Sequence, residues 1–164
     1  MLKKLFGKSV TEEHFVSPVN GKAVPLEEVP DPVFAEKMMG DGIAIEPTDD
    51  IIVSPIDAEV VQVFETKHAI GLKTEMGLEV LLHIGLDTVN LKGEGFDTFV
   101  KTGDKVSAGD KLVTFDKAFV EANAKSCVTP VIITNYEASE YTLEALFPEQ
   151  AIAGETQIFQ VKKK

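Results

Sequence analysis

The chain has 164 residues and carries 16 Lys and Arg against 27 Asp and Glu, for a formal net charge of −11. Its length suits one domain, and its 44% hydrophobic content is close to the globular average, so a sizeable core can form. The charge excludes nucleic acid as a partner, because phosphate binding needs a basic patch and the only basic clusters lie at Lys3–Lys4 and Lys162–Lys164.

The composition also narrows the compartment and the chemistry. No apolar run approaches the roughly 20 residues that a membrane span needs. Residues Met1–Gly7 have no long apolar core and no small-residue cleavage site, so we expect no secretory signal. The single cysteine, Cys127, excludes an internal disulfide and favours the cytoplasm. Neither Cys-x-x-Cys nor His-Glu-x-x-His occurs, which excludes two common classes of metal site.

Short β-prone runs, separated by Gly, Pro, Asn, Asp or Ser, follow one another along most of the chain. We expect residues 1–14 to form a flexible N-terminal tail and residues 15–164 to form a single domain. The spacing of the runs predicts an all-β fold, a compact antiparallel β-sandwich or barrel-like structure with few short helices. The runs are Val16–Leu26, Gly42–Pro47, Ile51–Val53, Glu59–Thr66, Ile70–Thr74, Leu78–Ile84, Phe96–Lys101, Lys111–Phe115, Val128–Thr134 and Thr156–Val161.

Helical signals are few and short. Residues 31–40 open with a capping aspartate and a proline and end on glycine, which supports two turns at most. Residues 116–125 are a second candidate with an aspartate as cap, and residues 137–146 are a weaker third. We expect Met38 and Met39 to pack at the end of the first helix.

A short internal repeat is present. Val16-Ser-Pro-Val-Asn-Gly-Lys and Val53-Ser-Pro-Ile-Asp-Ala-Glu each lead into a β-prone run. Two interpretations are equally favoured. The segments are two similar turns, since Ser-Pro and Asn-Gly are common turn formers, or they belong to a duplicated β unit whose halves pair.

Two histidines stand out. His83 lies inside an apolar run, Val80–Leu86, where a histidine is either a buried residue with satisfied nitrogens or a functional imidazole kept neutral by its surroundings. Phe64, Thr66 and His68 share one strand parity, so a persisting strand would place a hydroxyl beside the second imidazole.

Two imidazoles in one apolar hollow suit three tasks. They could hold zinc, although two ligands are too few for a protein-only site. They could form a nucleophile–base pair, although no Ser or Cys is obviously placed for it. One could take up a phosphoryl group while the other steadies it, since phosphoryl transfer needs mainly in-line positioning and hydrogen bonds. The pattern itself leaves all three open.

A second pattern points to a different activity. Residues 100–113 contain Gly-Asp-x-Val-x-x-Gly, and with the Asp-Lys-Ala at 116–118 they resemble a lipoyl-carrier domain, in which Lys117 would carry the lipoyl group. Such a lysine must lie at an exposed hairpin tip. Residues 118–125 favour a helix instead, so this swinging-arm function is the weaker hypothesis.

The most specific pattern is the block Leu82-His-Ile-Gly-Leu-Asp-Thr-Val-Asn-Leu-Lys-Gly-Glu-Gly-Phe96. Together with Val29–Lys37, Gly40–Pro47 and Phe64–Ala69, it resembles the glucose-specific IIA (EIIA-Glc type) family of the bacterial phosphoenolpyruvate-dependent sugar phosphotransferase system, over about residues 16–161. The family's compact antiparallel β-sandwich agrees with the fold expected from the β-prone runs.

The resemblance implies a phosphocarrier. His83 is then the acceptor, taking a phosphoryl group from the phosphocarrier HPr on Nε2 and passing it to a cysteine of a IIB domain for sugar uptake and phosphorylation. His68 matches the histidine that hydrogen-bonds the phosphoryl group, and Thr66 the hydroxyl that orients the pair. Gly85 lies where its backbone can approach the phosphate. A binding protein that uses the same histidines for regulation without turnover is the alternative.

The resemblance also implies a partner surface. Asp31 and Asp87 match acidic residues that meet arginine on HPr. Four apolar residues are assigned to a collar around the histidines: Val33, Phe34, Ile43 and Phe64. The implied partners are HPr, the IIB domain of a glucose-type permease, through which alone the chain reaches the membrane, and regulated transporters or kinases. No cofactor is required, but zinc could bridge His68 and His83 to a partner carboxylate at a regulatory interface.

Overall fold

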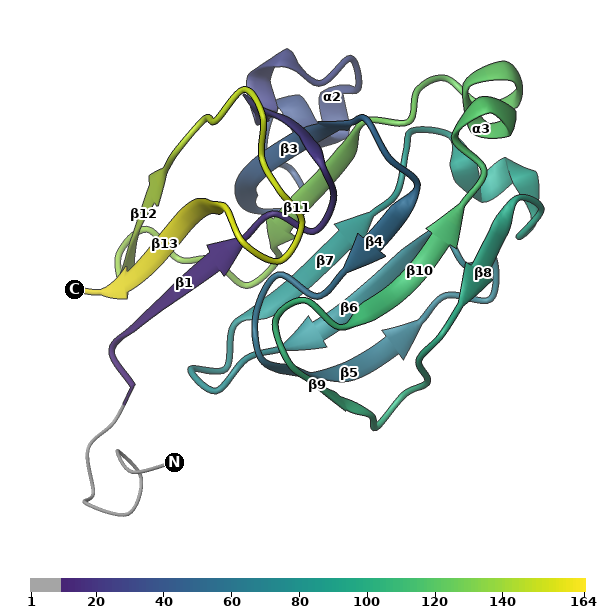
Figure 1. The fold of residues 1–164 in the computed structure, drawn as a ribbon. Helices are drawn as coiled ribbons and strands as arrows, with labels where there is room; N and C mark the ends of the chain where they lie inside the picture. Colours follow the sequence, from purple (N-terminus) through teal and green to yellow (C-terminus); the bar gives the residue numbers. More distant parts are fainter. Residues whose placement is uncertain (1–9) are drawn as a thin grey trace.

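Residues 10–164 are described by a computed structural model, in which the strands form three antiparallel sheets (Figure 1). The all-β fold class with few short helices is therefore confirmed. The described part contains no helix long and apolar enough to cross a membrane.

The largest sheet has seven strands in the order β2-β3-β11-β7-β6-β5-β9. Its members are β2 (Gly21–Pro25), β3 (Asp41–Pro47), β5 (Ala58–Val63), β6 (Ala69–Lys73), β7 (Glu79–His83), β9 (Lys105–Val106) and β11 (Thr129–Ile133). β2, β7 and β11 fall within the predicted runs, and β3, β5 and β6 begin one residue before theirs. This agreement arises because runs of Val, Ile and Leu bounded by turn residues are what a buried sheet requires.

Two three-stranded sheets accompany the large one. The first joins β1 (Glu12–Val16), β13 (Gln157–Lys163) and β12 (Tyr141–Ala145), and the second joins β4 (Ile51–Val53), β10 (Lys111–Phe115) and β8 (Phe96–Thr98). β1 and β13 pair antiparallel, so the first and last strands of residues 10–164 lie side by side (Figure 1).

The core lies between the sheets. Phe15 from β1, Ile70 from β6 and Val113 from β10 are all fully buried in one cluster, which shows that the three sheets share one interior. The large sheet carries a second buried cluster on its other face, which includes Ala69 and Leu81. Successive residues of a strand point to opposite faces, so β6 and β7 are covered on both sides.

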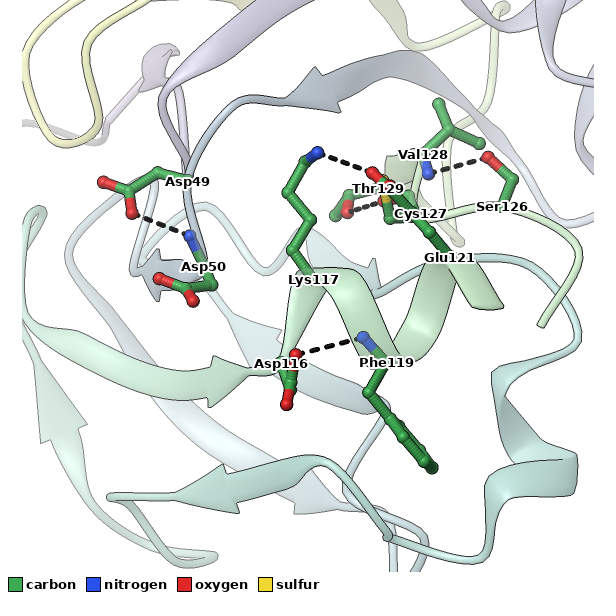
Figure 2. Close-up of polar contacts among 10 residues, drawn as sticks. All are labelled: Asp49, Asp50, Asp116, Lys117, Phe119, Glu121, Ser126, Cys127, Val128 and Thr129. Carbon is green, nitrogen blue, oxygen red and sulfur yellow. Dashed lines mark hydrogen bonds and ion pairs between the residues drawn. The ribbon is translucent and has the colours of Figure 1, made fainter. Parts of the chain in front are cut away.

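The helical segments are η1 (Leu26–Glu28), α2 (Pro32–Ala35), η2 (Thr88–Leu91) and α3 (Lys117–Asn123). The predicted caps are confirmed: the Asp31 carboxylate accepts from the Val33 amide, and the Asp116 carboxylate accepts from the Phe119 amide (Figure 2). The expected packing of the two methionines after α2 is wrong for Met38, which is 70% exposed.

Two predicted boundaries differ from the structure. Residues 137–146 do not form a helix, because Tyr141 and Leu143 alternate with exposed residues and pack on the core from β12, which pairs with β13. The predicted tail ended at residue 14, but β1 begins at Glu12, where pairing with β13 orders the backbone. The rest of that tail, residues 1–9, lies outside the described residues.

The internal repeat forms a reciprocal pair of turns. The Val16 amide donates to the Pro55 carbonyl at 2.9 Å, and the Val53 amide donates to the Pro18 carbonyl at 2.7 Å. Each repeat also has a buried serine whose hydroxyl donates to the carbonyl two residues later, at Val19 and Ile56 respectively. The two segments are therefore bound to each other at their turns, but the strands that follow them, β2 and β5, are not neighbours in the large sheet. A duplicated β unit whose halves pair stays a prediction.

Candidate functional site

The sheet places two histidines together at the ends of neighbouring strands. Ala69 of β6 pairs with His83 of β7, and the Ile84 amide donates to the His68 carbonyl at 2.7 Å. The two imidazole rings lie edge to face, with centroids 5.0 Å apart and an interplanar angle of 83°. His68 is buried and His83 is half-buried. This backbone ladder fixes the spacing of the rings.

A backbone carbonyl determines the tautomer of His83. Its Nδ1 lies 2.8 Å from the Gly85 oxygen. A carbonyl oxygen can only accept a hydrogen bond, so Nδ1 must hold the proton. The neutral ring then has its lone pair on Nε2, and that atom is the nucleophilic one.

The expected hydroxyl contact of His68 is present, but a turn makes it. Thr66 Oγ1 lies 2.7 Å from His68 Nδ1. β5 ends at Val63, and the Lys67 amide then donates to the Phe64 carbonyl, with Lys67 in the left-handed region at φ 61°. The contact between Thr66 and His68 was therefore predicted correctly, but its cause is a turn and not a strand that continues to His68.

The site keeps both imidazoles neutral. Burial and, to a smaller extent, the neighbouring His83 lower the pKa of His68 to about 4, against the opposing effect of a hydrogen bond to the Thr66 backbone. Burial also lowers the pKa of His83, against the opposing effects of the Gly85 carbonyl and the Asp31 carboxylate. At neutral pH both rings therefore present an uncharged nitrogen, as a nucleophile requires.

Two aromatic rings border the histidines. The Phe34 ring centroid lies 5.0 Å from that of His83, and the Phe64 centroid lies 5.6 Å from that of His68. Phe34 and Phe64 therefore lie where an apolar collar was expected. Phe34 is buried, whereas Val33, the residue before it in α2, is 39% exposed, and its place in the collar stays a prediction.

Ile43, the fourth predicted collar residue, is on the other face of the sheet. It is 0% exposed and belongs to the interior cluster, in register through Val131 with Leu82. His83 follows Leu82 and therefore points to the opposite face. Ile43 cannot contact a partner, because the β3 position that faces the histidine side is its neighbour Ala44.

The exposed apolar surface near the histidines extends beyond the predicted collar. Met39 and Val89 are 38% and 50% exposed. Met39 lines a shallow hollow with Phe64 and Leu81, and Val89 lies in η2, just after the turn that follows His83. Both residues stood inside or beside the quoted sequence blocks, but nothing in their spacing distinguished an exposed apolar residue from a core one.

The two predicted acidic residues lie in different settings. Asp31 is half-buried at the start of α2, where its charge acts on His83 and its side chain caps the helix. Asp87 is exposed and begins η2 with a left-handed backbone, φ 61°. Asp31 therefore lies at the site, whereas a place for Asp87 on the partner surface stays a prediction.

Gly85 allows the turn after β7 to pass close to its neighbours. Its φ is +79°, and an added Cβ would lie 2.6 Å from the Thr88 methyl carbon and 2.7 Å from the Ser126 carbonyl oxygen. No side chain fits there. The described contact of Gly85 is that of its carbonyl with His83, and the approach of its amide to a phosphate stays a prediction.

A metal site made by this chain alone and a lipoyl carrier both lack the residues that they need in the described part of the chain. The described residues include no group of three or more His, Cys, Asp or Glu that could hold a metal ion. Lys117 is the first residue of α3 and is ion-paired with Glu121, which in turn accepts from the Cys127 thiol (Figure 2). It is not at a hairpin tip, so the lipoyl-carrier interpretation of Lys117 is wrong.

Comparison with known proteins points to one family. Residues 13–139 match the family model described as phosphoenolpyruvate-dependent sugar phosphotransferase system, EIIA 1. Glucose-specific EIIA components from Bacillus cereus and Halalkalibacterium halodurans are 49% and 51% identical, over 100% and 99% of this chain and 100% and 98% of theirs. The glucose permease IIA structure from Mycoplasma capricolum superposes with a TM-score of 0.84 at 39% identity, covering 92% of this chain and 96% of that one.

Proposed function

Because the chain belongs to the EIIA 1 family of the phosphoenolpyruvate-dependent sugar phosphotransferase system, we propose that His83 is the residue that carries the phosphoryl group. Membership makes the protein a phosphocarrier that accepts phosphate from HPr and passes it to a IIB domain. The observation that supports His83 is its bond to the Gly85 carbonyl, which leaves the Nε2 lone pair available.

The proposed step is an in-line displacement at phosphorus. The Nε2 lone pair of His83 forms the new N–P bond as the N–P bond in phospho-HPr breaks, and the electron pair of that bond stays with the HPr imidazole. No proton has to leave His83, since its single N–H points to Gly85. Catalysis then consists of positioning and of stabilising the charge on the equatorial oxygens.

His68 is proposed to supply that stabilisation. If Thr66 donates to Nδ1, the proton of the neutral ring lies on Nε2 and can be donated to a phosphoryl oxygen. Because the pKa of His68 is about 4, the ring holds one proton at neutral pH and acts as a neutral donor. The Gly85 amide is proposed as a further donor.

The apolar surroundings are proposed to exclude water during transfer. Phe34 and Phe64 flank the two rings, and exposed Val33 and Val89 extend the apolar surface outward. A dry interface strengthens the hydrogen bonds to the phosphoryl group and prevents its hydrolysis. Asp31 and Asp87 are proposed to attract a basic partner surface, which favours fast and transient association.

The second transfer is proposed to go to a cysteine of the IIB domain, which forms an S–P bond as the N–P bond to His83 breaks. The protein would work in the cytoplasm, where a free thiol such as that of Cys127 stays reduced, and would meet the membrane only through the permease.

Zinc-dependent binding of other proteins is a second, regulatory proposal. Both Nδ1 atoms are already hydrogen-bonded, so two Nε2 atoms remain as the nitrogen ligands that zinc accepts. The described residues supply no third ligand, so a carboxylate of a regulated transporter or kinase would have to complete the site.

The test of the main proposal is phosphorylation by HPr, its phosphorylating enzyme and phosphoenolpyruvate. We expect one acid-labile phosphate on the wild-type chain and none on His83→Ala. His14→Ala is the matched control, because His14 pairs with Gln160 in β1 and is expected to be irrelevant to transfer. Phosphate retained by His83→Ala would overturn the assignment.

A further inference from the structure

A buried threonine, Thr88, supports the turn that orients His83. Thr88 is 0% exposed, and its hydroxyl donates to the Ile84 carbonyl at 2.6 Å. Its methyl carbon lies only 2.6 Å from the position that a Cβ on Gly85 would take, so it packs directly against that glycine. Both the hydroxyl and the methyl group of Thr88 therefore contact the turn.

Hydrogen bonds hold both of the peptide units that flank Gly85. The unit between Gly85 and Leu86 accepts from His83 Nδ1 and donates its amide to the Ser126 carbonyl at 2.8 Å. The unit between Ile84 and Gly85 has its carbonyl held by Thr88. Because the carbonyl and amide of one peptide unit point in opposite directions, Thr88 also fixes the direction of the Gly85 amide.

The glycine makes these anchors necessary. Gly85 has no Cβ to restrict its backbone, so both units could rotate if they were not held. A rotated Gly85–Leu86 unit would present an N–H instead of a carbonyl to His83. The Nδ1–H of His83 would then have no carbonyl acceptor, so the proton could move to Nε2 and the lone pair would no longer be confined to that atom.

We propose that Thr88 is a positioning residue for phosphoryl transfer: together with the bond from the Leu86 amide to the Ser126 carbonyl, its hydroxyl holds the turn whose Gly85 carbonyl keeps His83 in the tautomer with a nucleophilic Nε2. The inference rests on His83 being the acceptor. It makes Thr88 part of the site without contact to the phosphoryl group.

The test compares three threonine variants by ¹⁵N NMR of the histidine rings and by transfer kinetics. In the wild type we expect a single Nδ1–H tautomer at His83. Thr88→Val replaces the hydroxyl by a methyl group, so we expect a tautomer mixture and a kcat lower by about 10–100-fold, as for other groups that orient a reacting side chain, with the KM for phospho-HPr unchanged. Thr88→Ser keeps the hydroxyl and should restore both the tautomer and most of the kcat.

Thr74→Val is the matched control. Thr74 is also buried and its hydroxyl also donates, to Glu13, but it lies in the β6–β7 turn at the other end of these strands. It should lower stability and leave the His83 tautomer and kcat unchanged. If Thr88→Val does not fold, Thr88→Ala removes the hydroxyl without placing a methyl group against the Ile84 oxygen.

The outcomes separate the two proposals. The NMR readout needs no HPr, so it tests Thr88 even if the wild-type chain fails to take phosphate on His83, which would overturn the proposed function alone. A His83 tautomer and kcat in the hydroxyl-free variant equal to those of the wild type would overturn the role of Thr88. Equal losses in Thr88→Val and Thr74→Val would do the same, because they would trace the effect to stability.

Discussion

The ring edge of one imidazole faces the plane of the other: His68 and His83 are 5.0 Å apart between centroids and close to perpendicular. Each is tied through Nδ1 to a group two residues away, Thr66 in one case and Gly85 in the other. Both rings are therefore held through Nδ1, but only the tautomer of His83 is fixed by its partner. The Gly85 carbonyl can only accept a hydrogen bond, whereas the Thr66 hydroxyl can donate or accept.

This asymmetry predicts different results at the two histidines. His68→Gln should still take phosphate from HPr, because the nucleophile is intact, but should pass it to IIB more slowly by about 10²-fold or more. The glutamine amide is also a donor, but it does not place its N–H where the ring Nε2–H lies, so the developing charge loses the aligned donor. Rapid-quench measurement of both half-reactions separates the steps. Normal forward transfer by His68→Gln would rule out the stabilising role.

The lowered histidine pKa values make stability depend on pH. Unfolded histidines titrate near pH 6.5, whereas folded His68 titrates near 4, so the unfolded chain binds more protons between these values. The free energy of unfolding should therefore fall as the pH drops from about 6.5 to about 4, by roughly 3 kcal/mol at most for this residue. Urea unfolding of the wild type and His68→Gln at each pH measures the difference. Parallel curves for the two proteins would contradict the shift.

Gly85→Ala should lose both stability and transfer. Gly77→Ala is the control, because Gly77 also has a positive φ, 88°, but has no atom within 4 Å of an added Cβ. Backbone strain alone should cost Gly77→Ala about 1–2 kcal/mol. Overpacking against Thr88 and Ser126 should cost Gly85→Ala about 1–3 kcal/mol more. Thermal unfolding compares them, and equal losses would show that the turn can relax.

Substitutions on the two faces of the large sheet should have separate effects, one on HPr binding and the other on stability. Val33→Asp is expected to weaken HPr binding with a stability change within about 0.5 kcal/mol, since Val33 is exposed. Ile43→Ala should cost about 2–5 kcal/mol of stability because it opens a cavity in the core. Its HPr affinity, measured where the variant is folded, should match that of the wild type. A specific loss of affinity in Ile43→Ala would return that residue to the partner surface.

Charge at Asp31 can be removed without removing its cap. Asparagine caps helices as well as aspartate, so Asp31→Asn should keep α2 intact and slow association with HPr at low salt. Raising the ionic strength should reduce the difference from the wild type, because it screens exposed charges. Stopped-flow association rates at several salt concentrations check this. A wild-type rate that does not depend on salt would count against electrostatic attraction.

Most of the fold could be predicted from the sequence, because most of its strands are runs of β-prone residues bounded by turn residues. β4 and β10 were predicted to the residue, and both helix caps were correct. The misses have physical reasons. β9 has two residues and is too short to show a pattern, and β12 has helix-favouring Leu, Glu and Ala in a strand that only pairing with β13 defines.

The site was accessible only in part. The two histidines and Thr66 could be named from a local pattern and a family resemblance, because a contact two residues away is short in sequence. Alternation could not predict the β-bulge in β5 between Val60 and Gln62, which leaves Val61 exposed. The role of Thr88 could not be predicted either. In the sequence, a buried threonine that donates to a carbonyl cannot be distinguished from any other threonine in a loop.

The reciprocal turns at Val16–Pro18 and Val53–Pro55 have a consequence for how the chain folds. Their two hydrogen bonds join segments from different parts of the sequence, and the first turn also depends on the far end of the chain, where the Ser17 amide donates to the Thr156 carbonyl. Such distant contacts must close long loops before they stabilise anything, which places folding in the range of about milliseconds to seconds. No local segment can form this junction alone, so the domain should fold as one cooperative unit rather than sheet by sheet.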